Sequence, residues 1–259
     1  MGVIVLEAEA RAALLLARQA ELETEAGEML PGPSLHNALR GTTVALLAEV
    51  KRRSPSKGGI AELLDAVSQA RQYAEGGAAA VSILTEPHHF GGSVDDLVRV
   101  RAALEIPALK KDFHVAPIQL VEARALGASA ALLIARALSP RRLAEMLETG
   151  RRVGLELLVE VRDEAELERA LEGGATMIGV NNRDLESLEI EPATSERLIP
   201  RIPSALIAIA ESGVSTRADV ERYAACGADA VLVGSSLSAS AEPATSARAL
   251  CGVPRSRRG

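Results

Sequence analysis

The sequence contains no tryptophan, and its only aromatic residues besides histidine are two phenylalanines and two tyrosines among 259 residues. Because 47% of the chain is nevertheless hydrophobic, a packed core must be built from alanine, leucine, valine and isoleucine. The two cysteines, Cys226 and Cys251, lie far apart and form no CxxC pair. The cysteine pattern therefore predicts neither a zinc site nor a redox motif.

Long apolar runs are also missing. Glu7 and Glu9 interrupt the first apolar stretch, and no later stretch approaches the roughly 20 residues that span a bilayer. We therefore expect a cytoplasmic protein with no membrane partner. The net charge of -6 argues against a nucleic-acid partner, which would need concentrated lysine and arginine; the one late basic cluster, Arg255 to Arg258, is a short terminal tail.

Eight short runs rich in valine, isoleucine, leucine and alanine recur along the chain. They lack the apolar/polar alternation of a half-exposed strand, which predicts strands that are buried on both faces. The runs are 44–50, 79–84, 107–110, 129–134, 155–161, 176–180, 205–210 and 229–233.

Most pairs of runs are separated by a segment with helical periodicity. One such segment places six apolar residues on one face: Leu63, Ala66, Val67, Ala70, Tyr73 and Ala74. Glycine precedes alanine before several strands, at 76–78, 127–128, 173–175 and 227–228, where a helix end needs a residue that tolerates left-handed geometry. Repeated strand–helix units of this length predict a parallel sheet.

Eight units would close an α/β barrel of the (β/α)8 or TIM type. A doubly wound open sheet is the alternative, but it usually stops at five or six strands, and no GxGxxG motif follows the first run. We expect the barrel over residues 43–250, an N-terminal helical extension over 1–42 and a basic tail over 251–259, all within one domain. Residues 6–30 are predicted to form one helix that ends at Pro31-Gly32-Pro33.

Polar residues follow six of the predicted strands. In a parallel barrel these positions share one rim, where carboxylates and amines in a partly desolvated pocket can divide acid and base roles. A ring of structural or solvated charges is the alternative for any single residue. The candidates are Glu49 and Lys51; Lys111; Glu160; Asn181 and Arg183; Glu211 and Ser212; and Ser235. Lys110, beside Lys111, should point to the other side of its strand.

Two loops after the last strands suggest a phosphate site. Ser212-Gly213 and Gly234-Ser235-Ser236 occupy the positions where barrels commonly hold a phosphoryl group with backbone N–H donors. The polar loop from Ser54 to Gly59 is either a segment that closes over a substrate or a plain linker. We therefore expect a phosphorylated small-molecule substrate.

Seven motifs, taken together and in order, resemble those of indole-3-glycerol-phosphate synthases. They are AEVKRRSPSKGGI (48–60), LTEPHHFGGS (84–93), LKKDFHV (109–115), LLVEV (157–161), IGVNNRDL (178–185), AESGVS (210–215) and LVGSSL (232–237). The resemblance covers roughly residues 43–237. It implies a barrel enzyme of tryptophan biosynthesis that closes an indole ring on an anilino-deoxyribulose phosphate, with loss of carbon dioxide and water, without metal or cofactor.

The resemblance also implies roles for single residues. Lys111 matches the general acid of ring closure, Glu160 the acid/base of the dehydration, and Lys51 a second lysine positioned by Glu49. Other matches are to groups that orient or bind the substrate: Asn181, Arg183, Glu211 and Ser212 around its polar parts, Phe90 on its ring, and Gly213, Gly234, Ser235 and Ser54 at its phosphate.

His88 and His89 depart from the family pattern, which usually has aromatic rings there. A metal site is disfavoured, because the sequence places no carboxylate ligands obviously near the pair. Alternatives to the synthase are phosphoribosylanthranilate isomerase, although no cysteine ends the first strand, an FMN-dependent barrel oxidoreductase, and a non-catalytic barrel. The sequence leaves open whether the chain is a monomer and whether it associates with other tryptophan-pathway enzymes.

Overall fold

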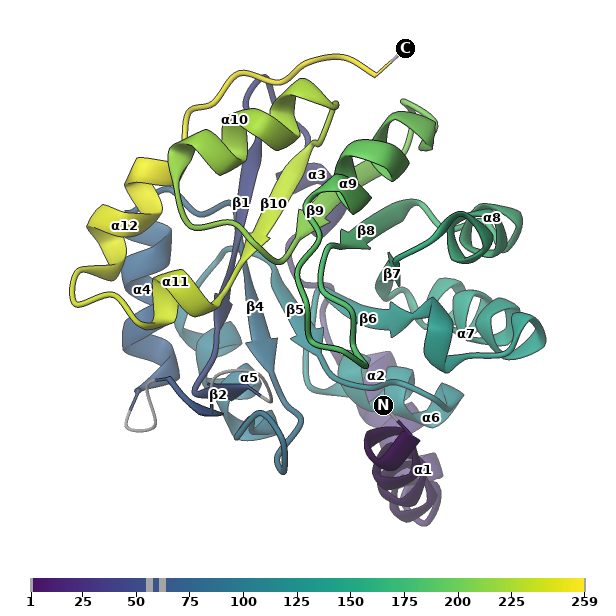
Figure 1. Ribbon diagram of the computed structural model, residues 1–259. Coiled ribbons are helices and arrows are strands. Elements are labelled where there is room, and N and C mark those ends of the chain that lie inside the picture. Colours follow the sequence, from purple (N-terminus) through teal and green to yellow (C-terminus); the bar gives the residue numbers. More distant parts are fainter. Residues whose placement is uncertain (1, 55–57, 61–63, 259) are drawn as a thin grey trace.

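The computed structural model describes residues 2–54, 58–60 and 64–258 and contains a closed barrel of eight parallel strands (Figure 1). Neighbouring strands follow the chain, and the last strand pairs with the first. The strands are β1 (Ala45–Val50), β4 (Ala80–Leu84), β5 (Ala108–Lys111), β6 (Ala130–Ile134), β7 (Glu156–Val161), β8 (Met177–Asn181), β9 (Ile207–Glu211) and β10 (Ala230–Val233). The predicted (β/α)8 barrel is thus confirmed.

Each predicted run overlaps one barrel strand, and the bounds differ by at most two residues. Nearly every strand residue is buried, because side chains on one face fill the barrel and those on the other pack against the helices. Lys110 points outward as expected: its Nζ donates to Glu122 of the surrounding helix layer at 2.8 Å. Lys111, one residue later, faces inward.

Helices surround the barrel and join its strands. Of the periodic segment predicted over Leu63 to Ala74, residues 66–74 lie in a helix, and Leu63 is outside the described residues. The glycines that end helices have positive φ, for example 97° at Gly77 and 93° at Gly227. The helices are α4 (Ala66–Glu75), α5 (Val94–Ala103), α6 (Pro117–Ala125), α7 (Pro140–Val153), α8 (Glu164–Glu172), α9 (Ala193–Leu198), α10 (Arg217–Ala225), α11 (Ser235–Ser238) and α12 (Pro243–Leu250), with short 3-10 helices at Ala135–Ala137 and Ile199–Arg201.

The single helix predicted over residues 6–30 is wrong. The extension forms α1 (Gly2–Leu16) and α2 (Gln19–Glu28), followed by α3 (Leu35–Ala38). The chain turns between α1 and α2 so that Ala12 and Leu22 can pack in one apolar cluster with Ile118 and Val121 of α6. Because neither glycine nor proline marks this turn, tertiary packing rather than local sequence decides it.

The C-terminal segment (yellow) runs across the top of the view in Figure 1, past the amino end of the first strand. Thr43 forms a β-bridge with Pro254, and the N–H of Val44 donates to the carbonyl of Val253 at 2.8 Å. Arg258 then reaches the N-terminal end of the barrel, where its guanidinium lies 2.8 Å from the carboxylate of Asp229. Both side chains are almost fully buried.

A small hairpin stands after the first barrel strand, formed by β2 (Arg53–Ser54) and β3 (Gly58–Gly59). The loop predicted to close over a substrate falls partly on residues 55–57, which lie outside the described residues. Among the helices that are described, none has both the length and the apolar composition to cross a membrane.

Candidate active site

The carboxyl ends of the strands surround a cavity of about 270 Å³. Eleven of the thirteen predicted site residues line it: Glu49, Lys51, Ser54, Phe90, Lys111, Glu160, Asn181, Arg183, Glu211, Ser212 and Ser235. The other two, Gly213 and Gly234, are chain neighbours of Ser212 and Ser235. Residues from seven different strands and the loops that follow them are therefore brought to one rim.

Lys111 stands at the centre of the charged part of this cavity. Its Nζ lies 3.4 Å from Glu160 Oε2 and 3.8 Å from Glu211 Oε2. The three side chains come from the ends of β5, β7 and β9 and are 15%, 5% and 2% exposed, respectively. An ammonium group held between two buried carboxylates can donate a proton to a substrate oxygen in the cavity.

Asn181 fixes the orientation of Glu160. Its Nδ2 donates to Glu160 Oε1 at 2.9 Å, while its Oδ1 accepts from the backbone N–H of Arg183 at 2.9 Å. One carboxylate oxygen of Glu160 is thus held by an amide, and the other faces Lys111. The guanidinium of Arg183 donates to the carbonyl of Leu188 at 2.8 Å, which places this side chain at the cavity wall.

Glu49 and Lys51 form an ion pair at the end of β1. Glu49 lies in β1 and Lys51 two residues later, directly after the strand, so both side chains point to the same side and line the cavity. The carboxylate of Glu49 packs against the Cα of Gly234, where any side chain would collide with it. In the same way, a side chain at Gly179 would collide with the carboxylate of Glu211. Two glycines thus leave room for two buried carboxylates.

The charges in the cavity shift one another's proton affinity. Burial would lower the pKa of Lys111, but Glu160, Glu211 and Glu49 outweigh burial and raise it, so the group stays an ammonium. Burial and the neighbouring Glu160 raise the pKa of Glu211 to about 8, despite the opposing effect of Lys111. Burial opposes ionisation of Glu49 too, but Lys51 and Lys111 hold its pKa below the ordinary value.

Comparison with known proteins gives the family. The sequence model of the family described as "Indole-3-glycerol phosphate synthase" matches residues 4–250. The chain belongs to the indole-3-glycerol phosphate synthase family. It is 48% identical to "Indole-3-glycerol phosphate synthase 1" of Streptomyces coelicolor, over 87% of this chain and 84% of the relative. It is also 50% identical to the synthase of Mycobacteroides abscessus, over 80% and 76% of the two chains, and 48% identical to that of Dehalococcoides mccartyi, over 85% and 87%.

Solved structures outside the synthase family share the fold. A 3-hexulose-6-phosphate synthase from Salmonella typhimurium superposes with a TM-score of 0.63 at 16% identity, over 80% of this chain and 96% of the other. A thiamine phosphate pyrophosphorylase from Pyrococcus furiosus gives 0.61 at 14% identity, over 84% and 96%. At such low identity these likenesses concern architecture alone.

The apolar part of the cavity contains both phenylalanines of the chain. Phe90 follows β4 and Phe113 follows β5, and their ring centroids are 6.4 Å apart. Only Phe90 was predicted. Phe113 was detectable because it stands two residues after Lys111 in the same motif. Aliphatic side chains complete this wall: Ile4, Leu84, Leu132, Ile134, Leu185, Leu188 and Leu232.

The loop after β9 has an unusual backbone. Ser212 has φ of 65°, a left-handed value that is rare outside glycine, and Gly213 follows with 83°. Asn182 holds this turn, because its Nδ2 donates to the carbonyl of Ser212 at 3.0 Å. Asn182 is fully buried, and its supporting role was not predicted.

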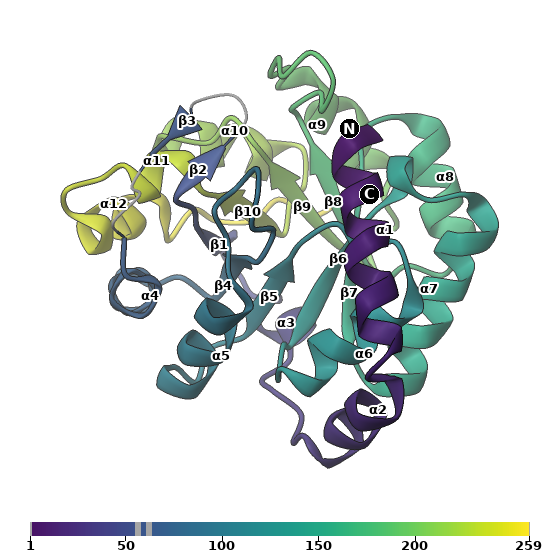
Figure 2. The same ribbon diagram turned by 90° about the horizontal axis from the view of Figure 1, so that it is seen from below.

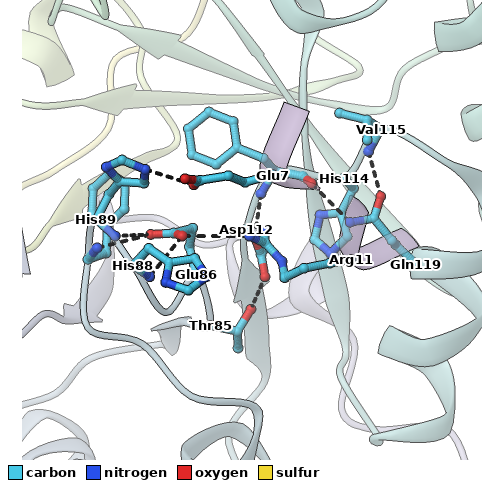
Figure 3. Close-up of polar contacts among 12 residues, drawn as sticks. Glu7, Arg11, Thr85, Glu86, His88, His89, Asp112, His114, Val115 and Gln119 are labelled. Carbon is cyan, nitrogen blue, oxygen red and sulfur yellow. Dashed lines mark hydrogen bonds and ion pairs between the residues drawn. The ribbon is translucent and has the colours of Figure 1, made fainter. Parts of the chain in front are cut away.

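Helix α1 also contributes to the cavity, which sequence reasoning missed. In Figure 2, α1 (purple) lies in front of strands β6 to β8, and Ile4 reaches the cavity wall. Arg11 of the same helix pairs with Asp112 at 2.7 Å, next to Lys111 (Figure 3). Asp112 lines the cavity as well, and its place after β5 was a usable signal. No such signal existed for Ile4, because its position depends on how the N-terminal extension packs.

The assumption that no carboxylate lies near His89 is wrong. Its Nε2 is 2.8 Å from Glu7 Oε2, and Glu86 lies beside both (Figure 3). The atoms of these three residues that could bind a metal ion lie within 4.8 Å of one another, as a metal site would require. However, Glu86 already accepts from the backbone N–H groups of residues 88, 89 and 90, and the Arg11 guanidinium is 3.6 Å from it. The contacts of these three residues thus join α1 to the loop between β4 and α5.

Proposed function

We propose that this cavity carries out the reaction of the family: decarboxylative ring closure and dehydration of 1-(2-carboxyphenylamino)-1-deoxyribulose 5-phosphate to indole-3-glycerol phosphate. Family membership makes the chain a carboxy-lyase of tryptophan biosynthesis. The assignment of residues to steps is supported chiefly by one observation. Lys51, Lys111 and Glu160, from three separate strands, face the same cavity as Ser212 and Ser235.

Lys111 acts first in this proposal, as the acid of ring closure. The aromatic carbon that bears the carboxylate attacks the ketone carbon, and Lys111 gives a proton to the ketone oxygen. The raised pKa of Lys111 keeps the donor charged, and the partly buried setting strengthens its interaction with the developing oxyanion. Phe90 and Phe113 offer the surface against which the aniline ring packs.

Carbon dioxide leaves next without help from a cofactor. Ring closure leaves a cationic iminium next to the carbon that carries the carboxylate, so the electrons of the breaking bond return to the ring and restore its aromaticity. Water then leaves: Lys51 protonates the departing hydroxyl, and Glu160 takes the proton from the neighbouring carbon. The Asn181 contact supports this role, because it holds Glu160 in one orientation.

The remaining polar groups bind the two ends of the substrate. Arg183 is the cationic side chain for the substrate carboxylate, and Glu49 keeps Lys51 in place. The phosphate lies against the backbone N–H groups of Gly213, Gly234 and Ser235, with the hydroxyl of Ser54 beside them. The left-handed turn at Ser212 and Gly213 supports this arrangement, since such turns expose successive backbone donors.

Turnover of the purified chain tests the proposal. With the anilino-deoxyribulose phosphate, we expect indole fluorescence to appear together with one carbon dioxide per product. A yellow protein with flavin absorbance and no turnover would instead favour the FMN-type oxidoreductase. A folded, colourless protein with no turnover would favour a non-catalytic barrel.

A further inference from the structure

Glu49 lies in strand β1 and Lys51 directly follows it, but the regular pairing of β1 on one side stops before it reaches these two residues. The parallel pairing with β10 ends at Ala48 and Val233, because β10 turns at Gly234 into α11. On this side the carbonyl of Glu49 and the N–H of Lys51 therefore have no strand partner. Glu49 is buried and Lys51 is partly buried, and an unpaired polar group in such a place is costly.

Ser238, the last residue of α11, takes the place of the missing strand. Its Oγ accepts from the N–H of Lys51 at 3.1 Å and donates to the carbonyl of Glu49 at 3.1 Å. A residue of a neighbouring parallel strand would make these same two bonds, to the residues on either side of Val50. One buried hydroxyl thus continues the pairing of β1 up to Lys51.

Two residues of α4 support this hydroxyl. Tyr73 Oη lies 3.2 Å from Ser238 Oγ, and Gln69 Nε2 donates to Tyr73 Oη at 2.8 Å. Tyr73 Oη also lies 3.4 Å from the carbonyl of Glu49, so its proton can go either to that carbonyl or to Ser238 Oγ. All three side chains are buried. The result is a buried chain of hydroxyl and amide groups around the carbonyl of Glu49, whose hydrogen bonds strengthen one another.

We propose that Ser238, supported by Tyr73 and Gln69, is a positioning residue for Lys51 and Glu49. Ser238 is not among the residues that line the cavity. It fixes the backbone from which both side chains project, and an error of about 1 Å in a catalytic group can cost about a hundredfold in rate. The expected effect of Ser238 on turnover rests on the proposed function. Its expected effect on the position of Lys51 does not.

Removal of the hydroxyl is the first test. We expect Ser238→Ala to lower kcat by about 10- to 100-fold while KM changes less than about threefold. Tyr73→Phe, which leaves Ser238 in place, should lower kcat by about three- to tenfold, and it tests the same chain if Ser238→Ala does not fold. Ser238→Thr keeps the hydroxyl and should keep most of the activity. Unchanged kcat in both Ser238→Ala and Tyr73→Phe would overturn the proposal.

Ser129→Ala is the matched control. Ser129 is also a buried serine that accepts from a strand N–H, that of Ala108, at 3.3 Å, but it lies at the opposite end of the barrel. Its kcat should stay within about twofold of the wild type. In a Lys51→Ala background, Ser238→Ala should cost less than about threefold, because its effect passes through Lys51. Equal losses with and without Lys51 would indicate a general structural role and contradict the proposal.

A readout without turnover separates this inference from the proposed function. The chain has four lysines, Lys51, Lys57, Lys110 and Lys111, so side-chain NMR of lysine-labelled protein gives four signals that substitution can assign. Ser238→Ala should move the Lys51 signal and leave that of Lys110. If the wild type does not turn over but the Lys51 signal moves, only the proposed function fails. If turnover is normal and the signal stays, only this inference fails.

Discussion

The two ends of the barrel both bury charged groups, but with different surroundings. At the carboxyl ends of the strands, Lys111 is 3.4 Å and 3.8 Å from two carboxylates, and all three groups face an open cavity. At the amino ends, Asp229 is enclosed by Arg255 and Arg258 and accepts from the backbone N–H of Ala208 at 2.7 Å. Charges that face a cavity can exchange protons with a ligand, whereas charges enclosed by protein hold the fold together.

Hydrogen bonding to the backbone supports this difference. Arg258 donates to the carbonyl of Leu206 at 2.5 Å and also to that of Gly227, so its charge is tied to two loops at the amino ends of the strands. Lys111 has no comparable backbone partner among the contacts of the described residues. The comparison predicts that changes at one end reduce activity and changes at the other reduce stability.

The largest effect is expected at Lys111. Lys111→Ala should lower kcat by about a thousandfold or more, because ring closure loses its proton donor, while the fold remains. The fluorescence assay for indole-glycerol phosphate measures the rate, and circular dichroism checks the fold. The matched control is Lys110→Met, on the same strand but facing Glu122. This variant should lose stability and keep kcat within a few fold; equal loss of kcat in both would refute the assignment.

At the other end, Arg258→Ala should lower the free energy of unfolding by about 3 kcal/mol, because a buried carboxylate loses one of its partners. Urea denaturation measures this loss, and kcat at saturating substrate should be unchanged. Arg257, next to it, is exposed, so Arg257→Ala is the control and should change stability little. A fall in kcat with unchanged stability would contradict the division between the two ends.

A pH-dependent change in stability is expected from Glu211. Its pKa is raised to about 8 in the folded protein by burial and by Glu160, against an ordinary value near 4.5. The folded state thus binds this proton more tightly, so the contribution to stability is complete below about pH 4.5 and is lost as the pH rises through 8. Urea denaturation of Glu211→Gln across this range should give a shallower decline. Glu189 is exposed, so Glu189→Gln is the control and should follow the wild-type curve. If Glu211→Gln also follows the wild-type curve, Glu211 is ionised in the folded protein and the prediction is wrong.

The smallest effect is expected where α1 meets the cavity. His89→Ala removes the partly exposed bond to Glu7 and should lower the free energy of unfolding by less than about 1 kcal/mol. Because Ile4 lies in α1 with Glu7 and lines the cavity, we expect the loss of this bond to raise KM about two- to threefold. Glu7→Ala should reproduce both changes, and Glu9→Ala, which alters an exposed side chain of α1, should cause neither. A tenfold loss of kcat would give His89 a part in the chemistry instead.

Much of the fold was predictable because barrel strands have a strong local signature. Apolar runs without alternation, several of them preceded by glycine, located all eight strands, and the polar residues after six of the strands located most of the cavity. The extension was not predictable in the same way. The turn between α1 and α2 exists because Ala12 and Leu22 pack on α6, and nothing near residues 17 and 18 indicates it.

The candidate site was predictable where its residues follow a strand directly. Glu86, Asp112 and Phe113 also follow strands and could have been added by the same rule. Ile4 and Ser238 could not. Ile4 acts from a helix outside the barrel, and Ser238 acts through a hydroxyl whose partners, 187 and 189 residues earlier in the chain, are backbone groups.

The bridge between Thr43 and Pro254 has a consequence for synthesis on the ribosome. Strand β1 is translated well before its partner β10 and the segment at 253–255 that bonds to residues 42–44. One edge of β1 therefore stays open until β10 and this segment have been translated, and open strand edges invite pairing with other chains. We therefore expect the nascent chain to be most prone to such pairing before β10 and residues 253–255 have been translated.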